Sequence, residues 1–194
     1  MRGLGPVCGI DEAGRGPWAG PVVAGAVILD PENIPVGLAD SKTLSKPRRE
    51  ALYEQLQDAA VIGVGRAEVA EIDALNILGA TMLAMARAVA DLGQLPGHAL
   101  VDGNRAPDLP CSLECLVKGD GRCLSIAAGS IIAKVTRDRE MTALAGRFPG
   151  FGWERNAGYG TPEHQAGLAR LGPNIMHRRS FAPIRKLLES AINS

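Results

Sequence analysis

Two adjacent carboxylates, Asp11 and Glu12, lie near the beginning of the chain between a short apolar stretch and a glycine-rich loop, Gly14-Arg15-Gly16. Adjacent anions repel each other, and glycines on both sides of an arginine cost backbone entropy, so folding alone gives little reason for this string. A divalent cation bound to the carboxylates and a phosphate bound to the loop would explain both features. The alternative, a surface turn after an edge strand, stays open at this point.

Local geometry limits how the two carboxylates could act together. Successive side chains of a regular strand face opposite sides, so Asp11 and Glu12 share a metal only if the strand ends or bulges there. We expect Ala13-Gly14 to supply that break. The glycines beside Arg15 would let a sugar-phosphate backbone approach main-chain N–H groups, and the Arg15 guanidinium could bind a phosphate through two parallel hydrogen bonds.

Two further acids, Asp102 and Asp120, follow short apolar stretches later in the chain. Functional residues of α/β sheets gather at strand ends, so we expect Asp11, Glu12, Asp102 and Asp120 to meet in one pocket. Two divalent cations would offset their charge, and oxygen ligands without histidine favour Mg²⁺ or Mn²⁺ over zinc. Such paired cations suit phosphodiester hydrolysis. Taken singly, either Asp-Gly pair is also a common turn.

The elements that must position these acids follow from hydrophobic periodicity and from turn residues. The pattern predicts strands at Val7–Ile10, Val22–Leu29, Val61–Ala67, Ala99–Val101 and Leu113–Val117, the first two forming an antiparallel pair. It predicts helices from Ser45 to Ala59, from Asn76 to about Asp91, from Ser125 to about Phe148, from Thr161 to Gly172 and from Pro183 to Ile192. This alternation indicates an α/β sheet with both faces covered.

Composition agrees with one domain. The chain has 194 residues, 46% of them hydrophobic, which suffices for one core and is too short for two ordinary domains. No secretion signal or membrane span is visible, so we expect a cytoplasmic protein, and its four cysteines lack the spacing of a metal site. Acidic and basic residues balance at 21 each, but residues 134–194 hold ten basic and five acidic residues, which suits a phosphate backbone.

The string Gly9-Ile10-Asp11-Glu12-Ala13-Gly14-Arg15-Gly16-Pro17 closely resembles the opening signature of the ribonuclease HII family. Later blocks of the chain are similar to that family's motifs, in its order, over nearly the whole length: Asp40-Ser41-Lys42, Val101-Asp102-Gly103, Lys118-Gly119-Asp120, Ala133–Asp138, Gly158-Tyr159-Gly160-Thr161 with His164, and His177-Arg178 with Ser180-Phe181. The related ribonuclease HIII class is disfavoured, because its extra N-terminal domain has no room here.

The resemblance implies a ribonuclease H-like fold, with a central mixed β-sheet flanked by helices and a small C-terminal helical extension over about residues 150–194. It implies an Mg²⁺- or Mn²⁺-dependent endoribonuclease that cleaves the RNA strand of RNA–DNA hybrids and leaves 5′-phosphate and 3′-hydroxyl ends. It also implies incision at single ribonucleotides embedded in duplex DNA, and thus a role in removing them. We expect a monomer that acts on these duplexes and on no membrane.

By matching motif, the resemblance makes Asp11, Glu12, Asp102 and Asp120 the catalytic, metal-binding acids. Gly14, Arg15 and Gly16 would read the ribose 2′-hydroxyl, Tyr159 would pack on the sugar at the RNA-to-DNA junction, Lys42 would meet a phosphate, and Arg178 would hold the duplex. The chain departs from the family pattern at Ala157, where many members carry lysine, and at Gly129, where many carry alanine.

Two other hypotheses stay open on the sequence. One is a metal-independent ribonuclease that uses His98, His164 or His177 as acid and base, although a packing or capping role suits His98 and His164 better. The other is a non-catalytic module that binds hybrids. Chelation separates the first from the carboxylate site, and the substitution Asp102→Asn separates the second from an enzyme.

Overall fold

The computed structural model describes residues 5–192 and is built on a five-stranded mixed sheet. Its strands are β1 (Val7–Ala13), β2 (Val22–Leu29), β3 (Ala60–Ala67), β4 (His98–Asp102) and β5 (Ser112–Leu116), in the spatial order β3-β2-β1-β4-β5. The pairs β1/β2 and β2/β3 are antiparallel, whereas β1/β4 and β4/β5 are parallel. The predicted mixed sheet and its antiparallel first pair are confirmed.

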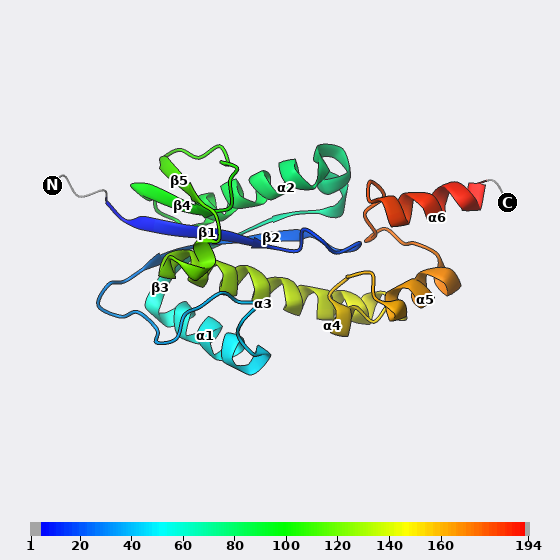
Figure 1. Ribbon diagram of the computed structural model, residues 1–194, viewed down its shortest axis with the longest axis horizontal. Coiled ribbons are helices and arrows are strands. Elements are labelled where there is room, and N and C mark those ends of the chain that lie inside the picture. The colour runs from blue at the N-terminus through cyan, green and yellow to red at the C-terminus, as the bar shows by residue number, and fades with distance from the viewer. Residues whose placement is uncertain (1–4, 193–194) are drawn as a thin grey trace.

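Helices cover both faces of this sheet (Figure 1). They are α1 (Lys46–Ala59), α2 (Val69–Asp91), α3 (Leu124–Arg147), α4 (Trp153–Asn156), α5 (Pro162–Leu171) and α6 (Ala182–Ile192), with a 3₁₀ turn, η1, at Gly119–Gly121. Helix α2 packs on one face, and α1 and α3 lie on the other. Helices α4, α5 and α6 lie beyond the end of the sheet, as the predicted C-terminal extension.

Each layer has its own apolar core. Alternate side chains of β1 and β2, such as Cys8, Ile10 and Ala26, pack against α2, while Val27 packs with α1 and α3 on the opposite face. A third cluster, which includes Met141, ties the end of α3 to α4, α5 and α6. The second and third cores therefore fix the position of α3 against both the sheet and the C-terminal extension.

Helix α3 approaches the sheet closely at the position of Asp11. A Cβ atom on Gly129 would lie 2.8 Å from the carbonyl oxygen of Gly25 and 3.2 Å from the backbone nitrogen of Asp11. Neither contact leaves space for an alanine without backbone movement. Gly129, one of the two departures from the family pattern, is thus one of three glycines, with Gly9 of β1 and Gly25 of β2, that let α3 pack directly on the sheet.

Two predicted boundaries are wrong. Strand β1 continues past Ile10 to Ala13, because β2 pairs with it in unbroken register up to Ala13 and Val23. Helix α2 starts at Val69, where Glu68 and Glu71 form a capping box, and bends at Asn76, whose φ is 60°. The Asn76 side chain accepts hydrogen bonds from the backbone of Leu78 and Gly79, so Asn76 does cap the second part of the helix.

Helix α2 is also long and apolar enough, by length and composition alone, to cross a membrane. Its buried residues, among them Ile72, Ala84 and Met85, belong to the core between the helix and the sheet. A helix that covers a sheet with its apolar face needs this composition, so we interpret α2 as a core helix.

Candidate active site

Three of the four predicted carboxylates meet at the carboxyl ends of the parallel strands. The parallel register pairs Ile10 with Val101, so Asp11 and Asp102 are the next residues along on neighbouring strands. The chain returns from β5 through η1, which brings in Asp120, and the backbone N–H of Gly119 donates to Asp102 Oδ1 at 2.7 Å. One oxygen from each of these acids lies within 4.8 Å of the other two.

The charges of this acidic cluster are not balanced by the protein. Asp11 is 3% exposed, and its Oδ2 atom is buried without a hydrogen-bond partner. Burial raises the pKa of Asp11 well above its usual range, and the nearby charges of Glu12 and Asp102 raise it further. Burial also raises the pKa of Asp120, with help from Asp40 and Asp102.

A hard divalent cation fits this donor set. Carboxylate oxygens are the ligands that Mg²⁺ and Mn²⁺ prefer, and a cation would supply the missing partner of Asp11 Oδ2. The nearest positive charge of the protein is Lys42, whose Nζ lies 3.9 Å from Asp120 Oδ2. Although partial burial lowers the pKa of Lys42, the charges of Asp11, Asp40, Asp120 and Asp102 together raise it.

Glu12 lies beside this cluster but does not enter it. Because β1 continues through Ala13, the break that would let both acids face one metal is absent, and the Glu12 carboxylate instead accepts a hydrogen bond from Arg15 Nη1 at 3.3 Å. Its charge still lies close enough to raise the pKa of Asp11. Glu12 remains a predicted metal ligand, and its Oε1 atom contacts Arg15 in this structure.

Two buried arginines donate hydrogen bonds to the glycine-rich loop after β1, which extends over residues 14–21. Arg178 donates to the carbonyl oxygens of five loop residues, at 2.6 to 3.1 Å: Gly14, Arg15, Pro17, Gly20 and Pro21. Arg137 donates to the carbonyls of Ala19, Pro21 and Ala157. Gly14 has a φ of 99°, and a Cβ there would lie 2.0 Å from Arg137 Nε, so only glycine fits.

Arg178 is therefore placed differently from our prediction. It is fully buried, and all its hydrogen bonds go to main-chain carbonyls, so its guanidinium cannot hold a duplex directly. Burial lowers the pKa of Arg178 to about 9 and that of Arg137 to about 10, each still far above neutrality. Both remain charged at pH 7, and Arg178 acts by shaping the loop.

The other predicted substrate residues share one pocket of about 280 Å³. Its lining comprises Glu12, Ala13, Gly14, Arg15, Gly16, Ser41, Lys42, Lys134, Arg137 and Tyr159. The Tyr159 ring packs over the loop, since a Cβ on Gly16 would lie 3.2 Å from Tyr159 Cε1. Residues from β1, from the segment before α1, from α3 and from the segment after α4 thus converge beside the acidic cluster.

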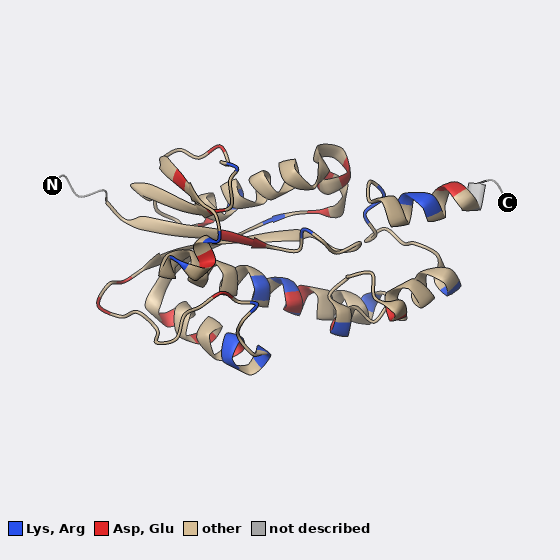
Figure 2. Cartoon of the chain, viewed as in Figure 1, with Lys and Arg blue, Asp and Glu red and all other residues tan. Residues whose placement is uncertain are grey.

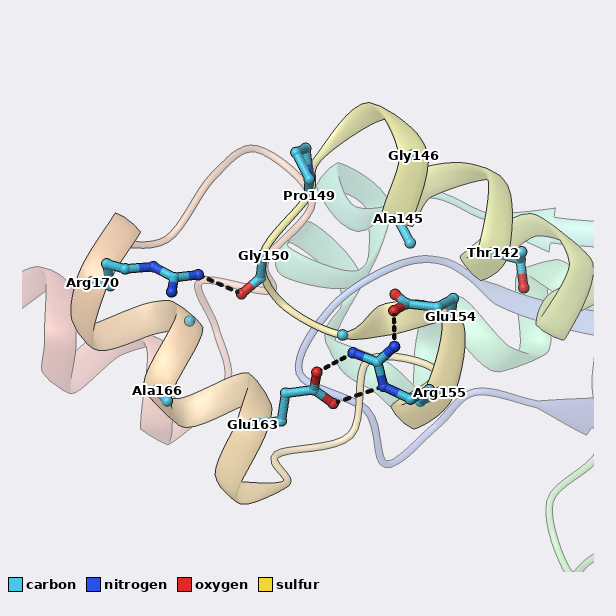
Figure 3. Close-up of a pocket in the computed structure, with 12 residues that line it drawn as sticks. Thr142, Ala145, Gly146, Pro149, Gly150, Glu154, Arg155, Glu163, Ala166 and Arg170 are labelled. Carbon is cyan, nitrogen blue, oxygen red and sulfur yellow. Dashed lines mark hydrogen bonds and ion pairs between the residues drawn. The ribbon is translucent and has the colours of Figure 1, made fainter.

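A larger cavity, of about 510 Å³, lies elsewhere (Figure 3). It is formed by the end of α3, by α4 and by α5, and the ion pairs of Arg155 with Glu154 and Glu163 cross its wall. None of the acids of the cluster and none of the predicted substrate residues line it. The size of a cavity therefore does not identify the chemical site in this molecule.

The distribution of charge supports in part the interpretation that the smaller pocket binds a phosphate backbone. Figure 2 shows acidic residues in β1 with basic residues on α1 and in the middle of α3. Four of the ten basic residues in the region 134–194 form ion pairs with carboxylates: Lys134, Arg139, Arg155 and Arg185. Arg137 and Arg178 are buried, so the predicted basic surface of the C-terminal third is smaller than its composition indicates.

The histidines do not form an alternative catalytic centre. His98 begins β4, at the opposite end of that strand from Asp102, and pairs with the Ser112 hydroxyl at 2.8 Å. His164 and His177 are 0% and 1% exposed, and their Nε2 atoms lie 3.1 Å apart. Burial keeps both from a substrate and lowers both pKa values, that of His177 to about 4.

Our sequence reasoning missed three polar residues that shape the site. Arg137 was part of a matched motif without a role, and nothing in its local pattern indicates burial. Ser130 of α3 forms a buried hydrogen bond with Ser41 at 2.7 Å, which holds the segment of Lys42 against the helix. His164, expected to pack or to cap, also contacts the backbone of Tyr159. A polar residue inside an otherwise apolar helix face was the available signal for Ser130.

Comparisons with known proteins agree with this geometry. The family model for ribonuclease HII matches residues 8–184. A ribonuclease HII from Paramagnetospirillum magneticum is 60% identical over 95% of this chain and 94% of its own length. The crystal structure of the ribonuclease H2 from Pyrococcus horikoshii matches with a TM-score of 0.81 and 30% identity, over 97% of this chain and 99% of that one.

A second solved structure, a complex of PCNA with ribonuclease HII from Archaeoglobus fulgidus, matches with a TM-score of 0.75 and 29% identity, over 89% of this chain and 93% of that one. The predicted family and its ribonuclease H-like fold are both confirmed. The chain belongs to the ribonuclease HII family, and is therefore a metal-dependent endoribonuclease that hydrolyses the RNA strand of RNA–DNA hybrids.

Proposed function

We propose that this enzyme also incises duplex DNA at a single embedded ribonucleotide, by two-metal-ion hydrolysis that leaves 5′-phosphate and 3′-hydroxyl ends. The observation that carries the proposal is the adjacency of the acidic cluster to the pocket of the glycine-rich loop and Tyr159. A nuclease that needs only one ribonucleotide must recognise that nucleotide at the point of cleavage. A recognition pocket bordering the metal-binding acids meets this requirement.

Asp11, Asp102 and Asp120 would hold the cations together with Glu12. When bound, such cations activate a water molecule and stabilise the leaving oxygen. In the overall reaction a bond forms between water oxygen and phosphorus, the bond from phosphorus to O3′ breaks, and the O3′ atom leaves as a hydroxyl. Lys42, beside Asp120, is in position to bind a phosphate next to the one that reacts.

The main chain from Gly14 to Gly16 would bind the 2′-hydroxyl of the ribonucleotide. Since neither glycine carries a side chain, the sugar-phosphate backbone can approach the loop N–H groups closely. The half-exposed ring of Tyr159 offers a flat apolar surface for the sugar of the adjoining nucleotide. A deoxyribonucleotide lacks the hydroxyl that the loop would bind, so the loop favours a ribonucleotide.

The test is cleavage of a labelled duplex with one ribonucleotide, in Mg²⁺, in Mn²⁺ or in EDTA, followed by analysis of the ends. We expect metal-dependent incision with 5′-phosphate and 3′-hydroxyl ends, and no incision of an all-DNA duplex. The variant Asp102→Asn should lose activity by orders of magnitude while it still binds the duplex. Cleavage that persists in EDTA and leaves cyclic phosphate ends would refute the proposal, as would activity on continuous hybrids alone.

A further inference from the structure

A buried hydrogen-bond chain lies beneath Tyr159, outside the chemistry described so far. His164 Nδ1 lies 2.9 Å from the carbonyl oxygen of Tyr159. Its other nitrogen, Nε2, accepts a hydrogen bond from Trp153 Nε1 at 3.2 Å and lies 3.1 Å from His177 Nε2. Both histidines are almost fully buried, so solvent does not compete for these contacts.

The partners of His164 determine where its proton lies. A carbonyl oxygen can only accept, so His164 Nδ1 must carry the hydrogen and donate to Tyr159. Trp153 Nε1 can only donate, so His164 Nε2 must be an acceptor. His164 is thus a neutral imidazole with the proton on Nδ1, and burial, which lowers the pKa of both histidines, agrees with that state.

The buried hydrogen-bond chain connects the two segments that face the proposed substrate. His177 pairs with Ala19, at the end of the glycine-rich loop, through an isolated β-bridge. On the other side, His164 donates to the carbonyl of Tyr159, which also accepts from the Thr161 N–H at 2.8 Å, and the Tyr159 ring lies over Gly16. No hydrogen bond to the Tyr159 hydroxyl is present within residues 5–192, so the ring's position depends on its backbone.

We propose that His164 is a positioning residue, whose Nδ1–H bond to the Tyr159 carbonyl holds the Tyr159 ring over the glycine-rich loop and thereby sets the rate of cleavage at a ribonucleotide. The proposal rests on the role of Tyr159 in the proposed function. His164 itself is buried and touches no substrate. A displacement of about 1 Å in such a positioning group can lower a rate by up to about a hundredfold.

Two substitutions separate the two nitrogens of His164. In His164→Asn the side-chain amide nitrogen lies near the place of Nδ1 and can still donate to Tyr159, whereas in His164→Gln the amide reaches the place of Nε2 and the donor to Tyr159 is lost. Both variants remove the ring and leave the charge unchanged. On a single-ribonucleotide duplex we expect His164→Asn to stay within about threefold of the wild-type kcat/KM, and His164→Gln to lose about tenfold or more.

A double-substitution cycle with Tyr159→Ala distinguishes positioning from general loss of structure. If His164 acts through the ring, His164→Gln should have no further effect on kcat/KM in the Tyr159→Ala background. Equal activity of the Asn and Gln variants, or additive losses in the cycle, would overturn the positioning role alone. If Tyr159→Ala cleaves like the wild type, the proposed role of Tyr159 fails, and the role of His164 fails with it.

The variant His177→Gln is the control for stability. It disturbs the buried pair but leaves the bond from His164 Nδ1 to Tyr159 intact. We expect a lower melting temperature with cleavage close to that of the wild type. A His177→Gln enzyme that folds but loses about tenfold in kcat/KM would overturn the proposal, and so would a loss of about tenfold in His164→Asn, which decides the question even if His164→Gln does not fold.

Discussion

Replacement of Asp11 by asparagine should stabilise the metal-free protein. Three carboxylate oxygens lie within 4.8 Å of one another, and Lys42 is the only cation that approaches the cluster among residues 5–192. Two unit charges 4.8 Å apart repel by about 3.5 kcal/mol at an effective dielectric constant of about 20. Proton uptake by Asp11, whose pKa is raised, relieves part of this repulsion. We therefore expect Asp11→Asn to gain about 2 kcal/mol in chelator.

A divalent cation should reverse the order of stability. At a concentration about 100-fold above its dissociation constant, a ligand that binds only the folded state adds about 2.7 kcal/mol. The wild type should gain this amount, and Asp11→Asn, which lacks the buried ligand oxygen, should gain much less. Thermal unfolding in EDTA and in Mn²⁺ measures both effects. For a chain of this length, 2 kcal/mol corresponds to a shift of about 4 to 8 °C in Tm.

The matched control is Asp108→Asn, which changes an exposed acid in the loop between β4 and β5 that forms no ion pair with any residue from 5 to 192. It should leave both melting temperatures unchanged. An Asp11→Asn variant that is no more stable than the wild type in EDTA, and that gains as much stability as the wild type from Mn²⁺, would contradict this prediction. In that case the three carboxylates neither repel each other strongly nor bind the cation together.

Four further results are expected. Arg178→Lys should lower the free energy of unfolding in denaturant by about 3 kcal/mol and reduce kcat/KM, because an ammonium with three donors cannot satisfy the five carbonyls of the loop. A variant with the same free energy of unfolding as the wild type would contradict this. Ala157→Gly should raise stability by about 1 kcal/mol, since Ala157 has a φ of 49°, and a lower Tm would count against this strain. Lys42→Ala should reduce the slope of log KM against log salt by about 0.9, as one phosphate contact is lost; an unchanged slope would argue against that contact. Lowering the pH from 6.5 towards 4 should destabilise the wild type by up to about 3 kcal/mol and the variant His177→Gln by less. In this range the unfolded state binds a proton on His177, whereas the buried side chain of the folded state, with a pKa of about 4, does not. Parallel pH profiles of stability for the two proteins would refute this.

The position of the acids could be predicted because it follows from a general property of sheets. Asp11 and Asp102 come at the carboxyl ends of apolar strands, and neighbouring parallel strands present those ends at one edge. The position of Asp120 depends on the turn after β5, which a Lys-Gly-Asp-Gly sequence favours. The left-handed conformation of Lys118 in this turn, with a φ of 57°, has no signal in the sequence. The orientation of Glu12 was not predictable, because it depends on how far β2 pairs with β1.

The roles of the two buried arginines could not be predicted, because the loop carbonyls that they bind lie more than 100 residues away in the chain. An arginine in a basic C-terminal third resembles a surface residue that binds phosphate. Arg178 is instead buried because the loop from Gly14 to Pro21 turns five carbonyl oxygens inwards, and a loop carbonyl must find a donor. Only the folded loop shows that demand. The pattern of charge along the sequence therefore overstated the basic surface.

These arginines also explain how the site can bind an anion next to its acids. Within residues 5–192, neither guanidinium forms an ion pair, so their hydrogen bonds go to main-chain carbonyls, and their charges are offset only at longer range by Asp138 and Glu140 for Arg137 and by Asp73 for Arg178. The carboxylates of Asp11, Asp102 and Asp120 lie beside that loop, and Lys42 compensates their charge only in part. A buried charge that is solvated only by dipoles favours a counter-ion at the nearest accessible surface. A phosphate at the loop would offset the charge of the arginines, and cations at the acids would offset that of the carboxylates, so we expect the charges of the site to be offset fully only when metal and nucleic acid are bound together.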